Sequence, residues 1–267
     1  MTFQPVIPQG GLGGWVFLNR TLDAQQSAFR KSPEIARDAD YFRQNIGSVT
    51  SAEALVADRR LLRVALGAFG LDADIDNRFF IRKVLEDGSL DPKALSNRLA
   101  DKRYLEFSKA FGFGDFAIPL SQVGDFAEKT ALAFETRQFE IAVGDSDQNL
   151  RLALGLSRDL GAIAARPSAD TTLWFTILGS PPLRQVFETA FGLPKGFGAL
   201  DLDQQVGILR DRAERAFGDD TVAQFADPDR MNELTRRFLI RADLQGGFSA
   251  TSRGAIALQL LQAGQPA

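Results

Sequence analysis

Three aspartates near the start of the chain have the alternating spacing of the first ligands in a calcium-binding loop. Asp72, Asp74 and Asp76 would occupy the first, third and fifth positions of such a loop. The sixth position is then Asn77 where the loop needs glycine, and the twelfth is Lys83 where it needs a bidentate glutamate. A lysine at the twelfth position would repel the cation. We therefore interpret the segment as a solvated turn before a helix.

Histidine and cysteine, the residues most used in catalysis and metal binding, do not occur among the 267 residues. Their absence excludes Ser-His-Asp and Cys-His catalysis, disulfides, iron–sulfur clusters and zinc sites built from these ligands. Asp and Glu are plentiful, but no pair of them lies in a recognisable catalytic motif. We expect a protein that is not an enzyme and that needs no cofactor and no metal ion.

The charge balance is nearly neutral, with 31 basic and 34 acidic residues and a formal charge of −3. This balance offers no electrostatic basis for binding nucleic acid. No apolar run approaches the length of a membrane span, so we expect no membrane insertion. The first 14 residues carry no basic residue and no continuous apolar run. We therefore expect no secretory signal peptide at this end.

Apolar residues recur at helical spacing along nearly the whole chain. Leu152, Leu156, Leu160 and Ile163 are a clear example, with steps of four, four and three residues. The segment 171–178 (TTLWFTIL) is the best candidate for a strand, but its apolar residues also fit one helix face. We predict an all-α fold, a multi-helix bundle of about ten to twelve helices of ordinary length.

Helix starts and stops are marked by local signals. A capping side chain precedes proline at Asp91-Pro92, Ser180-Pro181 and Asp227-Pro228, which predicts that a helix begins at each proline. A glycine just after an apolar stripe is typical of a helix that ends in a left-handed residue. These predicted helix ends are Gly70, Gly88, Gly112, Gly192 and Gly218.

The tripeptide Ala-Phe-Gly occurs four times, ending at Gly70, Gly112, Gly192 and Gly218. Together with similar flanking residues, this recurrence suggests a duplicated helical unit, while coincidence in a Phe- and Gly-rich chain is the alternative. We predict a flexible arm over residues 1–14, a first helical unit over 15–120 and a second over 121–267. If the tripeptide marks a duplication, the second unit is a diverged repeat of the first.

The first half is locally basic and rich in aromatic residues. Charged side chains of both signs are interleaved there, so ion pairs between helices are one interpretation. The other interpretation is a surface for a protein partner. The aromatic stretch 79–116 is either part of the core or a groove for a partner helix. The candidate partner-binding residues are Arg59, Arg63, Arg82, Lys102, Arg103 and Tyr104.

Several segments in this half also carry a family resemblance. They are 41–49 (YFRQNIGSV), 58–62 (DRRLL), 80–86 (FIRKVLE) and 97–104 (NRLADKRY), with an Ala-Phe-Gly ending at Gly70 and again at Gly112. Over about residues 15–115 the chain resembles a domain-of-unknown-function family of alphaproteobacteria, often encoded in flagellar gene clusters. The resemblance implies a helical protein with a role in the flagellum. It brings no activity, cofactor or catalytic residue.

We therefore expect a non-enzymatic interaction or structural protein associated with flagellar assembly or function, acting through contacts with a protein partner, for which a flagellar component is one candidate. With this role, we expect a cytoplasmic protein, or one exported by the flagellar apparatus without a cleaved signal peptide. A small-molecule-binding helical module or carboxylate-based enzyme is one alternative, and a flagellar export chaperone is another. The nearly uncharged segment 249–263 is expected to form a short apolar helix that docks on its own protomer or on a partner. Partner identity and oligomeric state stay open.

Overall fold

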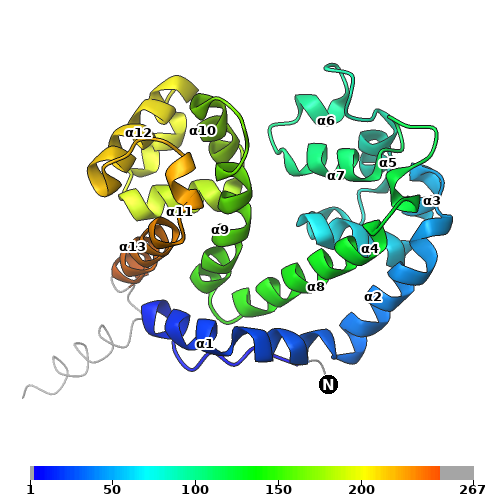
Figure 1. Cartoon of the computed structure of the whole chain (residues 1–267), viewed down its shortest axis with the longest axis horizontal. Coiled ribbons are helices and arrows are strands. Elements are labelled where there is room, and N and C mark those ends of the chain that lie inside the picture. Colours follow the sequence, from blue (N-terminus) through cyan, green and yellow to red (C-terminus); the bar gives the residue numbers. More distant parts are fainter. Residues whose placement is uncertain (1–2, 247–267) are drawn as a thin grey trace, which may run out of the picture. The chain divides into compact units, whose positions relative to one another are not determined.

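The computed structural model describes residues 3–246, and this part of the chain is helical with no strand (Figure 1). The all-α prediction is confirmed, and segment 171–178 lies within a helix. The predicted helix at 249–263 lies outside the described residues. The α-helices are α1 Gly11–Arg30, α2 Pro33–Asn45, α3 Ala52–Ala57, α4 Arg59–Phe69, α5 Arg78–Glu86, α6 Leu95–Arg98, α7 Arg103–Phe111, α8 Phe126–Gly144, α9 Gln148–Ala164, α10 Asp170–Leu178, α11 Pro181–Phe191, α12 Leu202–Phe217 and α13 Pro228–Gly246.

Short three-ten turns connect several of these helices: η1 Ile46–Ser48, η2 Asp72–Asp74, η3 Leu120–Gln122, η4 Lys195–Ala199 and η5 Ala223–Ala226. No helix within residues 3–246 combines the length and the apolar composition needed to cross a membrane.

Local capping explains several of the helix boundaries. The carboxylate of Asp58 accepts from the backbone N–H groups of Arg60 and Leu61 at 2.9 and 3.0 Å and starts α4. All five glycines predicted as helix ends have positive φ, between 62° and 76°. Helices α11 and α13 begin at Pro181 and Pro228 as predicted.

The predicted helix start at Pro92 is wrong. Asp91 instead accepts from the backbone N–H of Lys93 in a turn, and α6 begins only at Leu95. The side-chain amide of Asn97 donates to the carbonyls of Ser89 and Asp91, both at 2.8 Å. These bonds tie residues 89–91 to Asn97 on α6 and so keep the segment before α6 in a turn.

The described residues form two compact units whose boundaries differ from the predicted ones. Unit 1 comprises residues 3–6 and 18–146, and unit 2 comprises residues 7–17 and 147–246, so the division falls within α1. Helix α8 belongs to unit 1 because it packs on α2 and α4. Helix α1 begins at Gly11, inside the predicted arm, and the backbone of Val6 exchanges hydrogen bonds with the side chain of Gln25 at 2.7 and 3.1 Å.

Unit 1 is built on α2, α4 and α8, which pack on one another (Figure 1). Helices α3 and α7 pack on α4, and α5 packs on α3 and α7. Phe111 at the end of α7 is fully buried and is the centre of an aromatic cluster. Its ring lies 4.9 to 6.4 Å, centroid to centroid, from those of Phe69, Phe107, Phe113 and Phe126.

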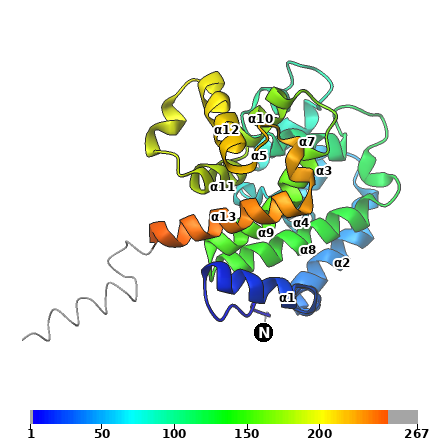
Figure 2. The same ribbon diagram turned by 60° about the vertical axis from the view of Figure 1, so that its left-hand side comes forward.

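Unit 2 is built on α9, α11 and α13, with α10 and α12 packed beside them (Figure 2). Its aromatic cluster centres on the fully buried Phe187 of α11. The rings of Trp174, Phe191 and Phe225 lie 5.4 to 5.6 Å from it. Apolar burial of this size supplies most of the driving force for folding each unit.

The four Ala-Phe-Gly endings are used in the same way in the two units. In unit 1 the phenylalanines of the two endings, Phe69 and Phe111, have ring centroids 6.4 Å apart with planes at 52°. In unit 2 the corresponding pair, Phe191 and Phe217, lies 6.2 Å apart with planes at 53°. Each glycine that follows is left-handed.

A second parallel concerns the last long helix of each unit. Arg137 of α8 donates through Nε to the carbonyl of Ala68 at 2.9 Å, and Arg237 of α13 donates to that of Ala190 at 3.2 Å. Both acceptors are the alanine of an Ala-Phe-Gly ending. These matching contacts support the hypothesis that unit 2 is a diverged copy of unit 1.

Candidate protein-binding surface

Two of the six candidate residues bind the aspartates of the 72–76 segment. Arg59 pairs with Asp76 at 2.7 Å, and the hydroxyl of Tyr104 donates to Asp74 at 2.6 Å. Burial, followed by this hydrogen bond, raises the pKa of Tyr104 to about 12. Asp72 accepts from the amide of a third helix, α8. The three carboxylates thus each tie the segment to a different helix. Within residues 3–246, no group of acidic side chains is arranged so that it could hold a metal ion.

Arg63 and Arg82 also make ion pairs. Arg63 contacts the buried carboxylate of Asp38 on α2 at 3.2 Å. Arg82 pairs with Glu86 on its own helix at 2.6 Å and with Glu53 of α3 at 3.2 Å. These contacts connect neighbouring helices of unit 1.

Lys102 and Arg103 lie at the start of α7 and bind the backbone. The ammonium of Lys102 donates to the carbonyls of Asn97 and Leu99, both at 2.9 Å. Arg103 pairs with Asp101 at 2.6 Å and donates to the carbonyl of Gly70 at the end of α4. All six candidate residues therefore make contacts inside unit 1: the four arginines in ion pairs, Lys102 with backbone carbonyls and Tyr104 with a carboxylate. Their role in binding a partner stays a prediction.

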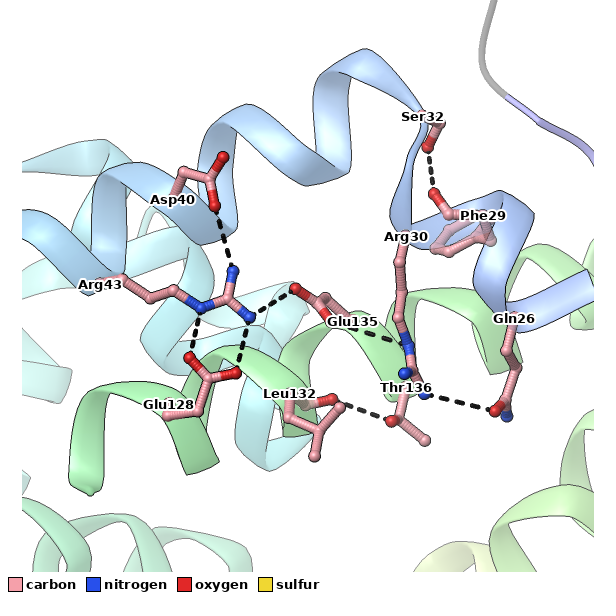
Figure 3. A network of polar contacts seen from close by, with 10 residues as sticks. All are labelled: Gln26, Phe29, Arg30, Ser32, Asp40, Arg43, Glu128, Leu132, Glu135 and Thr136. Carbon is pink, nitrogen blue, oxygen red and sulfur yellow. Dashed lines mark hydrogen bonds and ion pairs between the residues drawn. The ribbon is translucent and has the colours of Figure 1, made fainter. Parts of the chain in front are cut away.

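A further charged network joins α1, α2 and α8 (Figure 3). Arg43 lies at its centre and donates to both oxygens of Glu128 at 2.7 and 3.1 Å, and to Glu135 at 3.0 Å. Glu135 is only 6% exposed and also pairs with Arg30 at 3.7 Å. The hydrogen bonds with Arg43 lower the pKa of Glu128. Sequence analysis did not single out this network, because its members are up to 105 residues apart.

The most distinctive surface of unit 1 is the connection between α7 and α8. Asp115 accepts from the backbone N–H of Ser89 at 2.8 Å, from its hydroxyl at 2.7 Å and from the N–H of Leu90 at 3.1 Å. Gly114 packs directly on another loop, since a Cβ there would lie 2.3 Å from the carbonyl oxygen of Glu86. Only glycine permits this approach of two backbones.

Large apolar side chains point outward from this connection. Buried Pro119 and Ser121 anchor it, and η3 packs on η1, α7 and α8. Exposed apolar side chains gathered on an ordered surface are typical of sites that bind other proteins. We call these residues of the connection the apolar loop: Phe116, Ile118, Leu120 and Val123, with exposed fractions of 48, 65, 36 and 56%. Leu90, which is 69% exposed, lies on the second loop, where its N–H donates to Asp115.

The aromatic stretch 79–116 proves to be of mixed character. Phe107 and Phe111 are fully buried, as the core interpretation expects. Phe79 is 84% exposed and Phe116 is 48% exposed. The aliphatic members of the apolar loop were missed by sequence analysis. The sequence contains one signal for them, because the apolar residues around Pro119 do not recur at helical spacing.

The Asp115 contacts lead to a prediction about pH. Burial raises the pKa of Asp115, but the hydrogen bonds from Ser89 and Leu90 outweigh it, so the pKa is lowered overall. The charged form therefore stabilises the fold above the unfolded-state pKa of about 3.9, and this contribution is lost as pH falls through the lower folded-state pKa. Asp115→Asn should cost about 1 kcal/mol at neutral pH.

Urea unfolding at a series of pH values measures this effect. The difference between wild type and Asp115→Asn should be largest near neutral pH and shrink below about pH 4. Asp145→Asn, at an exposed position, is a suitable control. A difference that stays constant across the whole pH range would contradict the assignment.

Comparisons with known proteins place this fold in a family. The family model described as Protein of unknown function (DUF1217) matches residues 68–231, which is more than half of the chain. The chain belongs to this family. The DUF1217 match includes parts of both units, whereas the resemblance seen in the sequence lay within residues 15–115.

A crystal structure of an Agrobacterium tumefaciens protein, determined by a structural genomics consortium, has a similar fold. It is 27% identical, with a TM-score of 0.73, and the similarity covers 91% of this chain and 99% of the other. Among curated proteins, no match was found.

Proposed function

We propose that this DUF1217 protein is a non-enzymatic interaction protein that acts in flagellar assembly or function by binding a protein partner through the apolar loop. The observation that supports the proposal is the combination of exposure and order in this loop. Asp115 and Gly114 hold its backbone against a second loop, while Ile118 and Val123 stay more than half exposed.

The energetics favour a binding role for such a loop. Burying an exposed aliphatic side chain in an interface contributes roughly 1.5–3 kcal/mol. An already ordered loop loses little conformational entropy when it binds, so more of that energy appears as affinity. The flagellar part of the proposal rests on the resemblance of residues 15–115 to proteins encoded in flagellar gene clusters.

Swimming in soft agar tests the proposal. Deletion of the gene should abolish or strongly reduce the swimming radius, and the wild-type gene supplied in trans should restore it. The double variant Ile118→Ser/Val123→Ser should fail to restore it. Leu132→Ser is the matched control, because Leu132 is 43% exposed on α8, and it should restore swimming.

Two results would count against the proposal. A normal radius in the deletion strain would remove the flagellar role. Full restoration by Ile118→Ser/Val123→Ser would remove the apolar loop from that role. Immunoblots and thermal melts of the purified variants show whether each one accumulates and folds.

A further inference from the structure

Unit 2 contains a hollow between the turn η4 and helix α12. It has a volume of about 400 Å³, which is within the range of ligand pockets. Pro194, Phe197 and Ile208 contribute to an apolar lining. Arg212 and Arg215 also border the hollow and lie three residues apart, on the same side of α12.

A second hollow, of about 530 Å³, lies along α13. Ile240 and Leu244 are one helical turn apart within it and are 42% and 61% exposed. Arg236, Arg237 and Arg241 line the same hollow. This face of α13 is thus an apolar stripe with arginines along it.

A lining residue of each hollow lies at the end of α11. A Cβ on Gly192 would lie 2.1 Å from Nη1 of Arg241, which lines the second hollow. The next residue, Leu193, lines the first. A side chain at position 192 would displace the guanidinium of Arg241, and the positive φ of Gly192 favours glycine. We call the two hollows together the basic trough.

The charge of the basic trough is opposite in sign to that of the whole chain. Its lining has five arginines against Asp211 and Glu233, a net formal charge of +3, whereas the chain carries −3. Within residues 3–246 none of the five arginines is in an ion pair, although Arg237 donates to a carbonyl. The arginines of unit 1 that were discussed above are, in contrast, paired with carboxylates.

We propose that the basic trough binds an acidic, amphipathic segment of a partner protein. The apolar lining would take up aliphatic or aromatic side chains of that segment, in the manner of a helix in a groove. The arginines would pair with its Asp and Glu side chains, for which the planar guanidinium is well suited. This inference goes beyond the proposed function, because it concerns another surface, in the other unit, and it specifies the chemistry of the partner.

Selection of random peptides displayed on phage against the purified full-length chain tests the proposal. Selected peptides should be enriched both in Asp or Glu and in Leu, Ile, Phe or Trp. A labelled synthetic copy of one of them then gives a dissociation constant by fluorescence anisotropy. Binding should weaken by about tenfold or more in Arg212→Gln/Arg236→Gln, and it should weaken as salt is raised.

Two control variants make this test specific. Arg78→Gln/Arg98→Gln removes two exposed arginines of unit 1 that also lack an ion pair within residues 3–246, and it should bind the peptide like wild type. Ile118→Ser/Val123→Ser should also bind like wild type, so a failure of the apolar-loop proposal is distinguishable from a failure of this one. Thermal melts establish that each variant is folded.

Four results would overturn the proposal. The first is a set of selected peptides without acidic residues, and the second is an unchanged affinity in Arg212→Gln/Arg236→Gln. The third is binding through this trough to vesicles of phosphatidylserine and phosphatidylcholine instead of to peptides. The fourth is self-association that the double variant abolishes. Cosedimentation with the vesicles and light scattering after gel filtration measure the last two.

Discussion

Replacing Phe111 by alanine should lower the free energy of unfolding of unit 1 by about 3–5 kcal/mol. Phe111 is fully buried, and its ring contacts the rings of four other phenylalanines from α4, α7, the following loop and α8. Removing it leaves a cavity that these rings cannot all close, so the loss of packing adds to the loss of apolar burial.

Two spectroscopic probes separate the effect of Phe111→Ala from a general loss of structure. Far-UV circular dichroism follows the helices of both units. Tryptophan fluorescence follows unit 2, because Trp15 and Trp174 both belong to it. Urea unfolding should therefore show a clear shift by circular dichroism. Phe113→Ala is the control, since this half-buried ring stacks on Phe111 alone, and it should cost less. A shift below about 1 kcal/mol for Phe111→Ala would contradict its central place in the core.

Replacing Arg43 by methionine should destabilise unit 1 by about 2–4 kcal/mol. Methionine keeps much of the side-chain volume but removes the charge that faces Glu135. That carboxylate is 6% exposed and would keep only the longer contact with Arg30, at 3.7 Å. A buried charge that loses its partner is costly because burial has already removed most of its hydration.

The same network provides an internal control for Arg43→Met. Glu128 accepts from Arg43 in a bidentate arrangement, but its side chain is 64% exposed. Glu128→Gln should therefore cost less than about 1 kcal/mol, as exposed ion pairs do. Glu135→Gln combined with Arg43→Met should recover part of the loss, because the amide carries no charge. Equal costs for Arg43→Met and Glu128→Gln in urea unfolding would contradict the role given to Glu135.

The two proposals concern different surfaces and make different demands on a partner. The apolar loop of unit 1 offers aliphatic side chains on a fixed backbone. The basic trough of unit 2 adds five arginines to its apolar lining. If unit 2 is a diverged copy of unit 1, the units share their aromatic core while their surfaces differ, since Arg43, Arg63 and Arg82 of unit 1 pair with carboxylates and, within residues 3–246, the five arginines of the basic trough do not.

Helix positions could be predicted from the sequence because their causes are local. The steps of apolar residues predict α9, and the glycine after each Ala-Phe-Gly ending predicts a left-handed residue that the structure contains. Prolines after a capping residue predict the starts of α11 and α13. The same local rule failed at Pro92, where Asn97 holds the preceding segment in a turn.

The candidate surfaces could be identified only from the tertiary structure. Asp115 orders the apolar loop by reaching Ser89, which is 26 residues away, and no pattern near either residue reveals that contact. The six residues proposed from the sequence have the right types for a binding surface, but whether an arginine is free or paired depends on which carboxylates the fold brings to it.

The sequence by itself determined the helical class and several helix ends, because capping, glycine conformation and apolar periodicity act over a few residues. Only the tertiary structure decided where the units divide, which arginines are left without carboxylate partners and which apolar side chains stay exposed. Those properties depend on packing between helices that are distant in the chain, as with α2 and α8 in unit 1 and α11 and α13 in unit 2.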